Sequence, residues 1–102
     1  ESDRAEMLII TMLTRYFTAL WKISELHQSR VDLSEISRAV NVNQYFLSEY
    51  LDALKFYTEI DIQRALLILY RLDSSLKSTS QSPLSAVQTA LVQIISKTTV
   101  DE

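Results

Sequence analysis

The sequence predicts an all-α fold, a single domain built as a bundle of about five helices. Three observations support this prediction. Apolar residues recur every three or four positions along most of the chain, which is the period of a helix with one buried face. Residues that favour helix starts stand ahead of five such segments. The 102 residues include no glycine and one proline, which favours helices joined by short polar links, with Asn or Asp wherever a left-handed backbone is needed.

The first predicted helix begins with Asp3 and Glu6, a D-x-x-E capping pattern, and runs to about residue 28. Its apolar surface is wider than one core contact needs. Two neighbouring stripes form it: Leu8, Met12, Tyr16, Ala19, Leu20, Ile23 and Leu26, and beside them Ile9, Leu13, Phe17 and Trp21. A small bundle is expected to bury one stripe fully and about half of the other, which leaves an exposed apolar patch.

Two further helices are predicted between residues 32 and 57. Asp32 and Glu35 repeat the capping pattern, and Asn41 closes the short helix because asparagine tolerates the left-handed conformation. Asn43 then caps the third helix. The expected apolar residues are Leu33, Ile36, Ala39 and Val40 in the second helix, and Tyr45, Phe46, Leu47, Tyr50, Leu51 and Leu54 in the third.

Thr58 and Asp61 are predicted to cap the fourth helix. Ser82 followed by Pro83 predicts the start of the fifth, because proline suits the first helical position. A polar linker, KSTSQS, separates them. Their expected apolar residues are Ile62, Ala65, Leu66, Leu69, Leu72 and Leu76, and then Leu84, Val87, Leu91, Ile94 and Ile95. We expect one domain over residues 1–102, with a frayed tail at 97–102. A strand interpretation of ALLILY and VQIIS is disfavoured because the neighbouring residues keep the helical period.

The residue inventory leaves little for catalysis. His27 is the single histidine and stands near a helix end, where histidine usually caps carbonyls or faces water. There is no cysteine, and the absence of glycine excludes phosphate-binding loops such as GxxxxGK[ST]. Three carboxylate pairs, Asp32/Glu35, Glu49/Asp52 and Glu59/Asp61, are interpreted as caps or solvated faces. We therefore predict no catalytic residue, no metal site, no cofactor and no small-molecule substrate.

Residues 33–51, LSEISRAVNVNQYFLSEYL, have the outline of a helix-turn-helix DNA reader. The charge balance argues against DNA: 10 Lys and Arg stand against 13 Asp and Glu, for a net charge of −3. In the candidate reading helix Glu49 and Asp52 would repel phosphates, and its first cation is Lys55. Packing against protein is the favoured interpretation, with a DNA-binding transcription factor domain as the alternative.

The strongest candidates for a protein interface lie in the first helix. Tryptophan, tyrosine and arginine are favoured at the centres of interfaces. We predict that Arg15, Tyr16 and Trp21 contribute to such a surface. Stacking of these aromatics on nucleic acid is the weaker interpretation, because Arg15 and Lys22 are the only basic residues close by.

Four linked segments resemble the C-terminal domain of the delta subunit of the bacterial DNA polymerase III clamp loader. They are RYFTALWKISEL, VDLSEISRAVNVNQYFLSEYLDALKFYT, EIDIQRALLILYRLDSSLKS and SPLSAVQTALVQI, which together span about Arg15 to Ile95. Their order and spacing carry the resemblance. The turn of Val40 to Asn43 lacks the glycine and proline common in that family, and Ser48 and Glu49 stand where it is often basic.

The resemblance implies an assembly module that joins other loader subunits in a helical collar, with clamp opening and ATP hydrolysis located elsewhere in the complex. It therefore implies protein partners, no enzymatic activity of this segment, no specific nucleic-acid binding and a cytoplasmic location. No apolar run is long enough to span a membrane, so no membrane partner is expected. The chain begins with Glu1 rather than Met, and we expect it to be the C-terminal piece of a longer chain.

Overall fold

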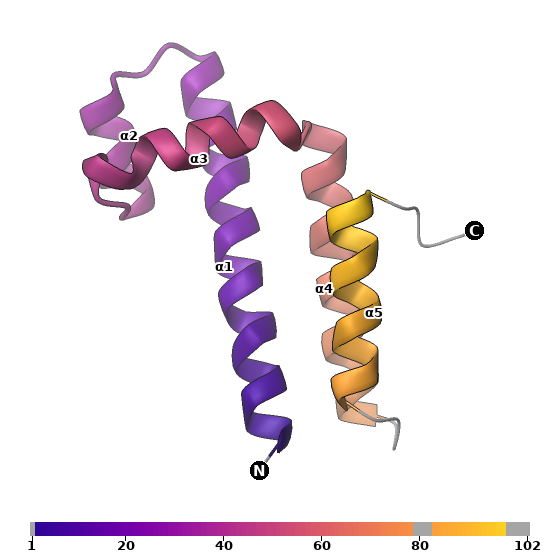
Figure 1. The fold of residues 1–102 in the computed structure, drawn as a ribbon. Helices are drawn as coiled ribbons and strands as arrows, with labels where there is room; N and C mark the ends of the chain where they lie inside the picture. The colour runs from indigo at the N-terminus through magenta and orange to yellow at the C-terminus, as the bar shows by residue number, and fades with distance from the viewer. Residues whose placement is uncertain (1, 79–82, 98–102) are drawn as a thin grey trace.

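Five helices make up the part of the chain that the computed structural model describes, residues 2–78 and 83–97 (Figure 1). They are α1 (Ser2–Gln28), α2 (Leu33–Val40), α3 (Gln44–Phe56), α4 (Glu59–Ser78) and α5 (Pro83–Ser96). No strand occurs in these two ranges. The all-α prediction and the number of helices are confirmed.

The turn between α2 and α3 follows the sequence prediction closely. Asn41 adopts the left-handed conformation, with φ 58° and ψ 43°. The backbone N–H of Val42 donates to the Ser37 carbonyl at 3.1 Å, the reversed bonding that commonly ends a helix at a left-handed residue. Asn43 then caps α3, where its side-chain oxygen accepts a hydrogen bond from the Tyr45 N–H at 2.8 Å.

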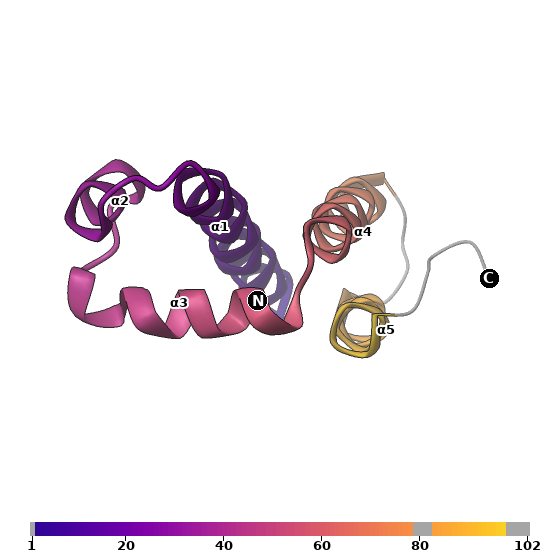
Figure 2. The same cartoon turned by 90° about the horizontal axis from the view of Figure 1, so that it is seen from above.

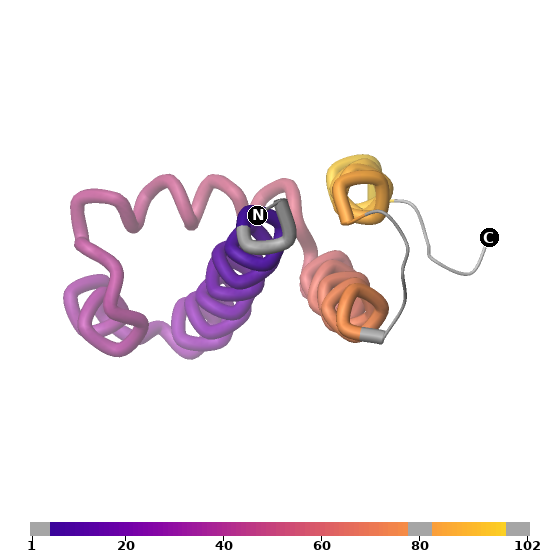
Figure 3. Tube along the Cα trace, turned by 90° about the horizontal axis from the view of Figure 1, so that it is seen from below, coloured from indigo at the N-terminus to yellow at the C-terminus, as the bar shows by residue number. Residues whose placement is uncertain are grey.

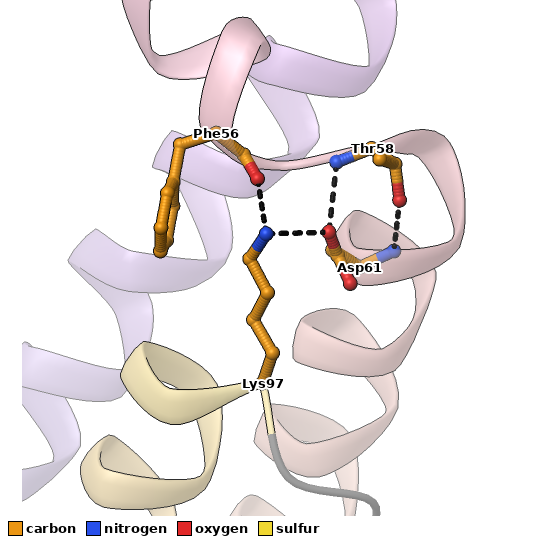
Figure 4. Close-up of polar contacts among 4 residues, drawn as sticks. All are labelled: Phe56, Thr58, Asp61 and Lys97. Atoms are coloured by element: carbon orange, nitrogen blue, oxygen red, sulfur yellow. Dashed lines mark hydrogen bonds and ion pairs between the residues drawn. The ribbon is translucent and has the colours of Figure 1, made fainter.

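Thr58 and Asp61 form a reciprocal capping box at the start of α4, also as predicted. The Thr58 backbone N–H donates to Asp61 Oδ2 at 2.9 Å, and the Asp61 N–H donates to Thr58 Oγ1 at 3.2 Å (Figure 4). Two of the orphan donors at this helix end are thereby satisfied. Pro83 is the first residue of α5, as expected, whereas Ser82 lies outside the described residues.

Two predicted caps differ from the structure. The α1 helix begins at Ser2, so Asp3 lies inside its first turn, and the Asp3 side chain falls outside the described part. Glu6 does not face solvent at a helix start: it is buried, and its Oε1 has no hydrogen-bond partner among the described residues. At α2, Asp32 occupies the N-cap position without a side-chain capping bond, because its carboxylate accepts a hydrogen bond from Ser34 Oγ at 2.6 Å.

The helices form two groups that share α1. Helices α1, α4 and α5 lie side by side, and α3 runs across one end of this group toward the start of α4 (Figures 1 and 2). Helix α2 packs on α1 and α3, beyond the bundle. The N-terminus of α1 lies at the end of this group away from α3 (Figure 1), and Figure 3 shows the same helices from that end, with α1, α4 and α5 seen nearly along their axes. Helix α1 contacts each of the other four helices, so it forms a wall of both groups.

Two apolar clusters correspond to these groups. The main core lies among α1, α4 and α5 and is formed by Ile10, Phe17, Leu20, Ile62, Ala65, Ile68, Leu69, Leu72, Val87, Ala90 and Ile94. A smaller cluster, here called the hairpin core, joins α1, α2 and α3 through Ile23, Ile36 and Leu47, each of which is at most 1% exposed.

The predicted pattern of burial on α1 is wrong in its N-terminal half. Leu8 and Met12, both assigned to the first stripe, are 59% and 60% exposed. Ile10 and Phe17 point into the main core instead, and Ile10 belonged to neither stripe. The reason is the placement of α4 and α5, which contact the side of α1 that carries Ile10 and Phe17 and leave the opposite side uncovered. Exposed apolar side chains on α1 were therefore correctly expected, and they include Leu8, Ile9 and Met12.

Lys97 joins the end of α5 to the corner between α3 and α4. Its ammonium donates a hydrogen bond to the Phe56 carbonyl, lies 3.3 Å from Asp61 Oδ2, and lies 4.0 Å from the centre of the Phe56 ring (Figure 4). These residues, Phe56, Thr58, Asp61 and Lys97, are called the Lys97 cluster below. Residues 98–102 are outside the described part, so the frayed tail stays a prediction.

Replacement of Asp61 by asparagine is expected to lower the free energy of unfolding by about 0.5–2 kcal/mol at pH 7, the usual cost of losing a cap. The backbone N–H of Thr58 lowers the pKa of Asp61 below its ordinary value, burial opposes this effect, and Lys97 lowers the pKa further. A lowered folded-state pKa gives stability that is present above the unfolded pKa, near 3.9, and is lost as the pH falls through the folded value. The difference between wild type and variant should therefore shrink in acid.

Urea denaturation at neutral pH and at about pH 3 measures this difference. Asp52→Asn is the matched control, because Asp52 lies in an exposed pair with Lys55 at 3.5 Å and has no capping role in α4. A penalty for Asp61→Asn that is equal at both pH values, or equal to that of Asp52→Asn, would contradict the assignment.

Candidate functional site

An open groove runs along the solvent side of α1 beside the end of α2. Its volume is about 1050 Å³. It is lined from α1 by Met12, Leu13, Thr14, Arg15, Tyr16, Thr18, Ala19 and Lys22, from α2 and the turn after it by Ala39, Val40, Asn41 and Val42, and from α3 by Tyr50. We call it the α1–α2 groove. It is larger than the groove between α1 and α4 described below, and it is open to solvent.

The α1–α2 groove exists because α2 is short and packs through one buried side chain. Ile36 is fully buried in the hairpin core, while Val40 and Val42 are only partly buried at the groove edge. The left-handed Asn41 turns the chain back toward α3 at this point. The C-terminal end of α2 and its turn therefore form one wall, Tyr50 of α3 contributes a second, and the exposed side of α1 forms the floor and its basic edge.

Two cations line the α1 side of the groove. Arg15 and Lys22 are both exposed, and neither takes part in an ion pair within the described ranges 2–78 and 83–97. The α3 side differs: burial raises the pKa of Tyr16, the neighbouring Tyr50 and Tyr57 raise it further, and Glu49, next to Tyr50 in α3, adds to this effect. The groove therefore has an apolar floor, a basic edge on α1 and an acidic residue near its α3 wall.

Tyr16 is held in the groove wall by a chain of aromatic contacts. Its ring centre lies 5.3 Å from that of Tyr50 and 5.3 Å from that of Phe17. The chain continues from Phe17 to Tyr57 at 5.2 Å and from Tyr57 to Phe56 at 4.8 Å, where it meets the Lys97 cluster. Offset and edge-on ring pairs of this kind stabilise packing beyond the area they bury, so Tyr16 presents a fixed surface.

The structure separates the three predicted interface residues. Arg15 and Tyr16 line the α1–α2 groove, whereas Trp21 is partly buried against the main core and does not line it. Positions 16 and 21 lie about 140° apart around a helix of 3.6 residues per turn, which explains the separation. Arg15 also borders a second, smaller groove of about 350 Å³ between α1 and α4, which includes Tyr70 and Asp73.

Lys22 was not among the predicted site residues, and the walls that α2 contributes were not predicted either. Two signals were present in the sequence. Arg15 and Lys22 are seven residues apart, which places them on the same side of a helix. Val40 and Val42 flank the predicted helix-ending Asn41, but their approach to α1 depends on how α2 folds back, which no local pattern specifies.

Other apolar side chains are also exposed. Helix α5 carries no charged residue, and its outer side presents Leu84, Val92 and Ile95, each more than half exposed. The first turn of α3 presents Tyr45, 82% exposed, with Phe46 against it at a ring distance of 5.2 Å. Exposed apolar patches such as these commonly mark protein–protein interaction sites.

The described residues offer no group of three or more histidine, cysteine, aspartate or glutamate side chains that could hold a metal ion. His27, the single histidine, is exposed in the last turn of α1, as expected. None of the helices in ranges 2–78 and 83–97 has the length and apolar character needed to cross a bilayer.

The α2–α3 pair does have the outline of a helix-turn-helix, and the structure shows what its second helix presents. Gln44, Tyr45 and Ser48 are exposed at the start of α3, but the Asn43 side-chain oxygen is occupied by its own capping bond. Farther along α3, Glu49 and Asp52 are exposed. A helix that entered a DNA groove would bring these carboxylates toward phosphates.

We therefore expect the chain not to bind duplex DNA with sequence specificity. Fluorescence anisotropy with labelled duplexes at low and physiological salt tests this. Any weak binding at low salt should disappear as salt rises and should not differ among sequences. A sequence-specific complex that persists at physiological salt, and that is lost on replacing Gln44 by alanine, would support the helix-turn-helix alternative.

Comparison with known protein families gives one match. The family described as DNA polymerase III delta subunit, C-terminal domain, matches residues 1–94, most of the chain and all of the elements that form the α1–α2 groove. No curated protein and no solved structure matches the chain at a significant level.

Proposed function

Because the chain belongs to the family of C-terminal domains of the DNA polymerase III delta subunit, we propose that it is an assembly module of a bacterial replication clamp loader. Its partners are other subunits of the loader, which it joins through a helical collar. Clamp opening and ATP hydrolysis take place elsewhere in the complex, so this segment is not itself an enzyme. The cytoplasm is the location that this role requires.

The observation that supports this proposal most directly is the uncovered side of α1. Leu8 and Met12 are 59% and 60% exposed on the helix that forms a wall of both apolar clusters. Large apolar side chains exposed beside an open groove are typical of a surface that another protein covers. The acidic net charge, −3, agrees with protein rather than nucleic-acid partners.

Arg15, Tyr16 and Trp21 are proposed to contribute to the assembly surface in different ways. Arg15 is exposed and Tyr16 is held in the groove wall, so both can contact a partner directly. Trp21 is partly buried against the main core. Its packing there holds α1 in place, so its contribution to the assembly surface is indirect.

Single alanine substitutions test this assignment through co-assembly with the other loader subunits. Arg15→Ala and Tyr16→Ala are expected to weaken assembly about 5- to 30-fold each, the effect of losing about 1–2 kcal/mol at an interface centre. Arg15→Ala should leave the melting temperature unchanged, because Arg15 makes no ion pair within the described part of the chain. Trp21→Ala should lower both the melting temperature and assembly.

Arg64→Ala is the matched control for Arg15→Ala, because Arg64 is exposed on α4 away from the α1–α2 groove. If all three variants remain folded and assemble like wild type, this surface is wrong. If the wild-type chain does not join the loader subunits at all, the proposed function itself fails.

A further inference from the structure

The spacing of the two groove cations gives the α1–α2 groove a definite chemistry. Arg15 and Lys22 are seven residues apart on α1, so their side chains leave the same side of the helix, about 10.5 Å apart along its axis. Both are exposed and without an ion pair within the described residues; Glu25, three residues beyond Lys22, forms none with it. Two unpaired cations seven residues apart on a helix can form ion pairs with two carboxylates that are seven residues apart on another helix.

The part of the groove floor between Arg15 and Lys22 is formed by small side chains. Thr18 and Ala19 are small and lie midway between Arg15 and Lys22, so another backbone can approach α1 closely there. On either side of them the groove is apolar, with Met12 at one end and Val40 and Val42 in the wall formed by α2 and its turn. An occupant must therefore bring apolar side chains between its two acidic groups.

We propose that the α1–α2 groove binds an amphipathic helix of a partner protein, with acidic residues at positions i and i+7 facing Arg15 and Lys22. Apolar residues at i+3 and i+4 of that helix lie over Thr18 and Ala19. This inference rests on the proposed function and names the partner segment at the same surface. Recognition of this kind, by an apolar stripe with anchors at i, i+3, i+4 and i+7, is a common mode of helix binding in grooves.

A helix fits the groove better than a nucleic acid strand does. A strand would bring a phosphate at every nucleotide, whereas the groove offers two cations and places Glu49 near its α3 wall. The phosphates would make no favourable contact with the apolar floor of the groove. A helix places charge only along one edge of its apolar stripe, and Glu49 disfavours a second acidic edge on the α3 side.

The probe is a fluorescein-labelled helical peptide of about 18 residues, alanine-rich, with glutamates at i and i+7 and leucines at i+3 and i+4 between them. The control peptide carries lysine in place of both glutamates. By anisotropy, the acidic peptide should bind the wild-type chain at least about tenfold more tightly than the basic peptide. Equal binding of the two peptides, or no binding of either, would overturn the inference.

Charge reversal on the protein gives the second arm. The Arg15→Glu/Lys22→Glu variant should lose about tenfold or more in affinity for the acidic peptide and should gain affinity for the basic peptide. Lys55→Glu, an exposed reversal on α3 outside the groove, should leave both affinities unchanged. Circular dichroism melting of each variant establishes that it is folded. Failure of the basic peptide to bind the reversed variant, with folding intact, would contradict the pairing.

Co-assembly with the other members of the loader distinguishes failure of the groove inference from failure of the proposed function. If the wild-type chain and the double-reversal variant assemble equally well, the groove inference is wrong and the proposed function stands. If the wild-type chain does not assemble, the proposed function fails, and the peptide measurements alone decide the chemistry of the groove. Loss of assembly only in the double-reversal variant supports both.

Discussion

Replacing Phe17 by alanine is expected to lower the free energy of unfolding by about 3–5 kcal/mol, the usual cost of removing a buried phenylalanine. Phe17 is 3% exposed and lies in the main core, where α1 packs against α4 and α5. It is also the middle of the aromatic chain, edge-on to Tyr16 at 5.3 Å and to Tyr57 at 5.2 Å. The substitution leaves a cavity where α1 packs against α4 and α5, and packed helices relax only partly into such a cavity.

Urea denaturation followed by far-UV circular dichroism measures this loss. Phe46→Ala is the matched control, since it is the same change at a position that is 47% exposed on α3. We expect the control to cost less than about 1 kcal/mol, because about half of the removed surface is already in water. Equal penalties at the two positions would mean that Phe17 is not a core residue in solution.

Replacing Ile36 by alanine is expected to destabilise the hairpin core by about 2–5 kcal/mol. Ile36 is 0% exposed and is the buried residue of α2, a helix of eight residues. A helix of this length is not stable alone in water, so its structure depends on tertiary contacts. Because α1 and α3 are the helices that α2 contacts within the described residues, the loss should first appear as local opening of α2 and of the turn at Asn41.

Amide hydrogen exchange separates local from global effects. In Ile36→Ala, protection should fall most in α2, less in α3, and least in the part of α4 that packs in the main core. Ile60→Ala is the matched control, because Ile60 is 60% exposed at the start of α4 and should change neither region. A uniform loss of protection across the chain would instead show that the two cores unfold as one unit.

Helix existence and helix ends could be predicted from the sequence because they depend on neighbours along the chain. Asn41, Asn43 and the Thr58–Asp61 box each act within a few residues, and the structure places each of them as predicted. Asp32 shows the limit of such signals. Its carboxylate had an alternative local partner, the Ser34 hydroxyl, and the residue types alone do not decide between the two.

Burial on α1 could not be predicted in the same way, because α1 is apolar on more than one side and the bundle covers one side. Local periodicity shows that both sides are apolar, but only the positions of α4 and α5 select the side with Ile10 and Phe17 over the side with Leu8 and Met12. The candidate site is affected by the same ambiguity. Arg15 and Tyr16 fall in the groove, while Trp21 lies on the side of α1 that the bundle covers in part.

The position of α1 in both cores has a consequence for the order in which the chain folds as it is synthesised. The partners of α1 in the hairpin core, α2 and α3, are the next segments to leave the ribosome, and their contacts are close in sequence. The main core needs α4 and finally α5, whose contacts with α1 close loops that contain all of α2 and α3. Helix α1 therefore gains its hairpin partners early, while the side with Ile10 and Phe17 is covered first by α4 and completely only when α5 has been made. During that interval the nascent chain exposes core residues of α1, and a chaperone that binds them would protect the chain from aggregation.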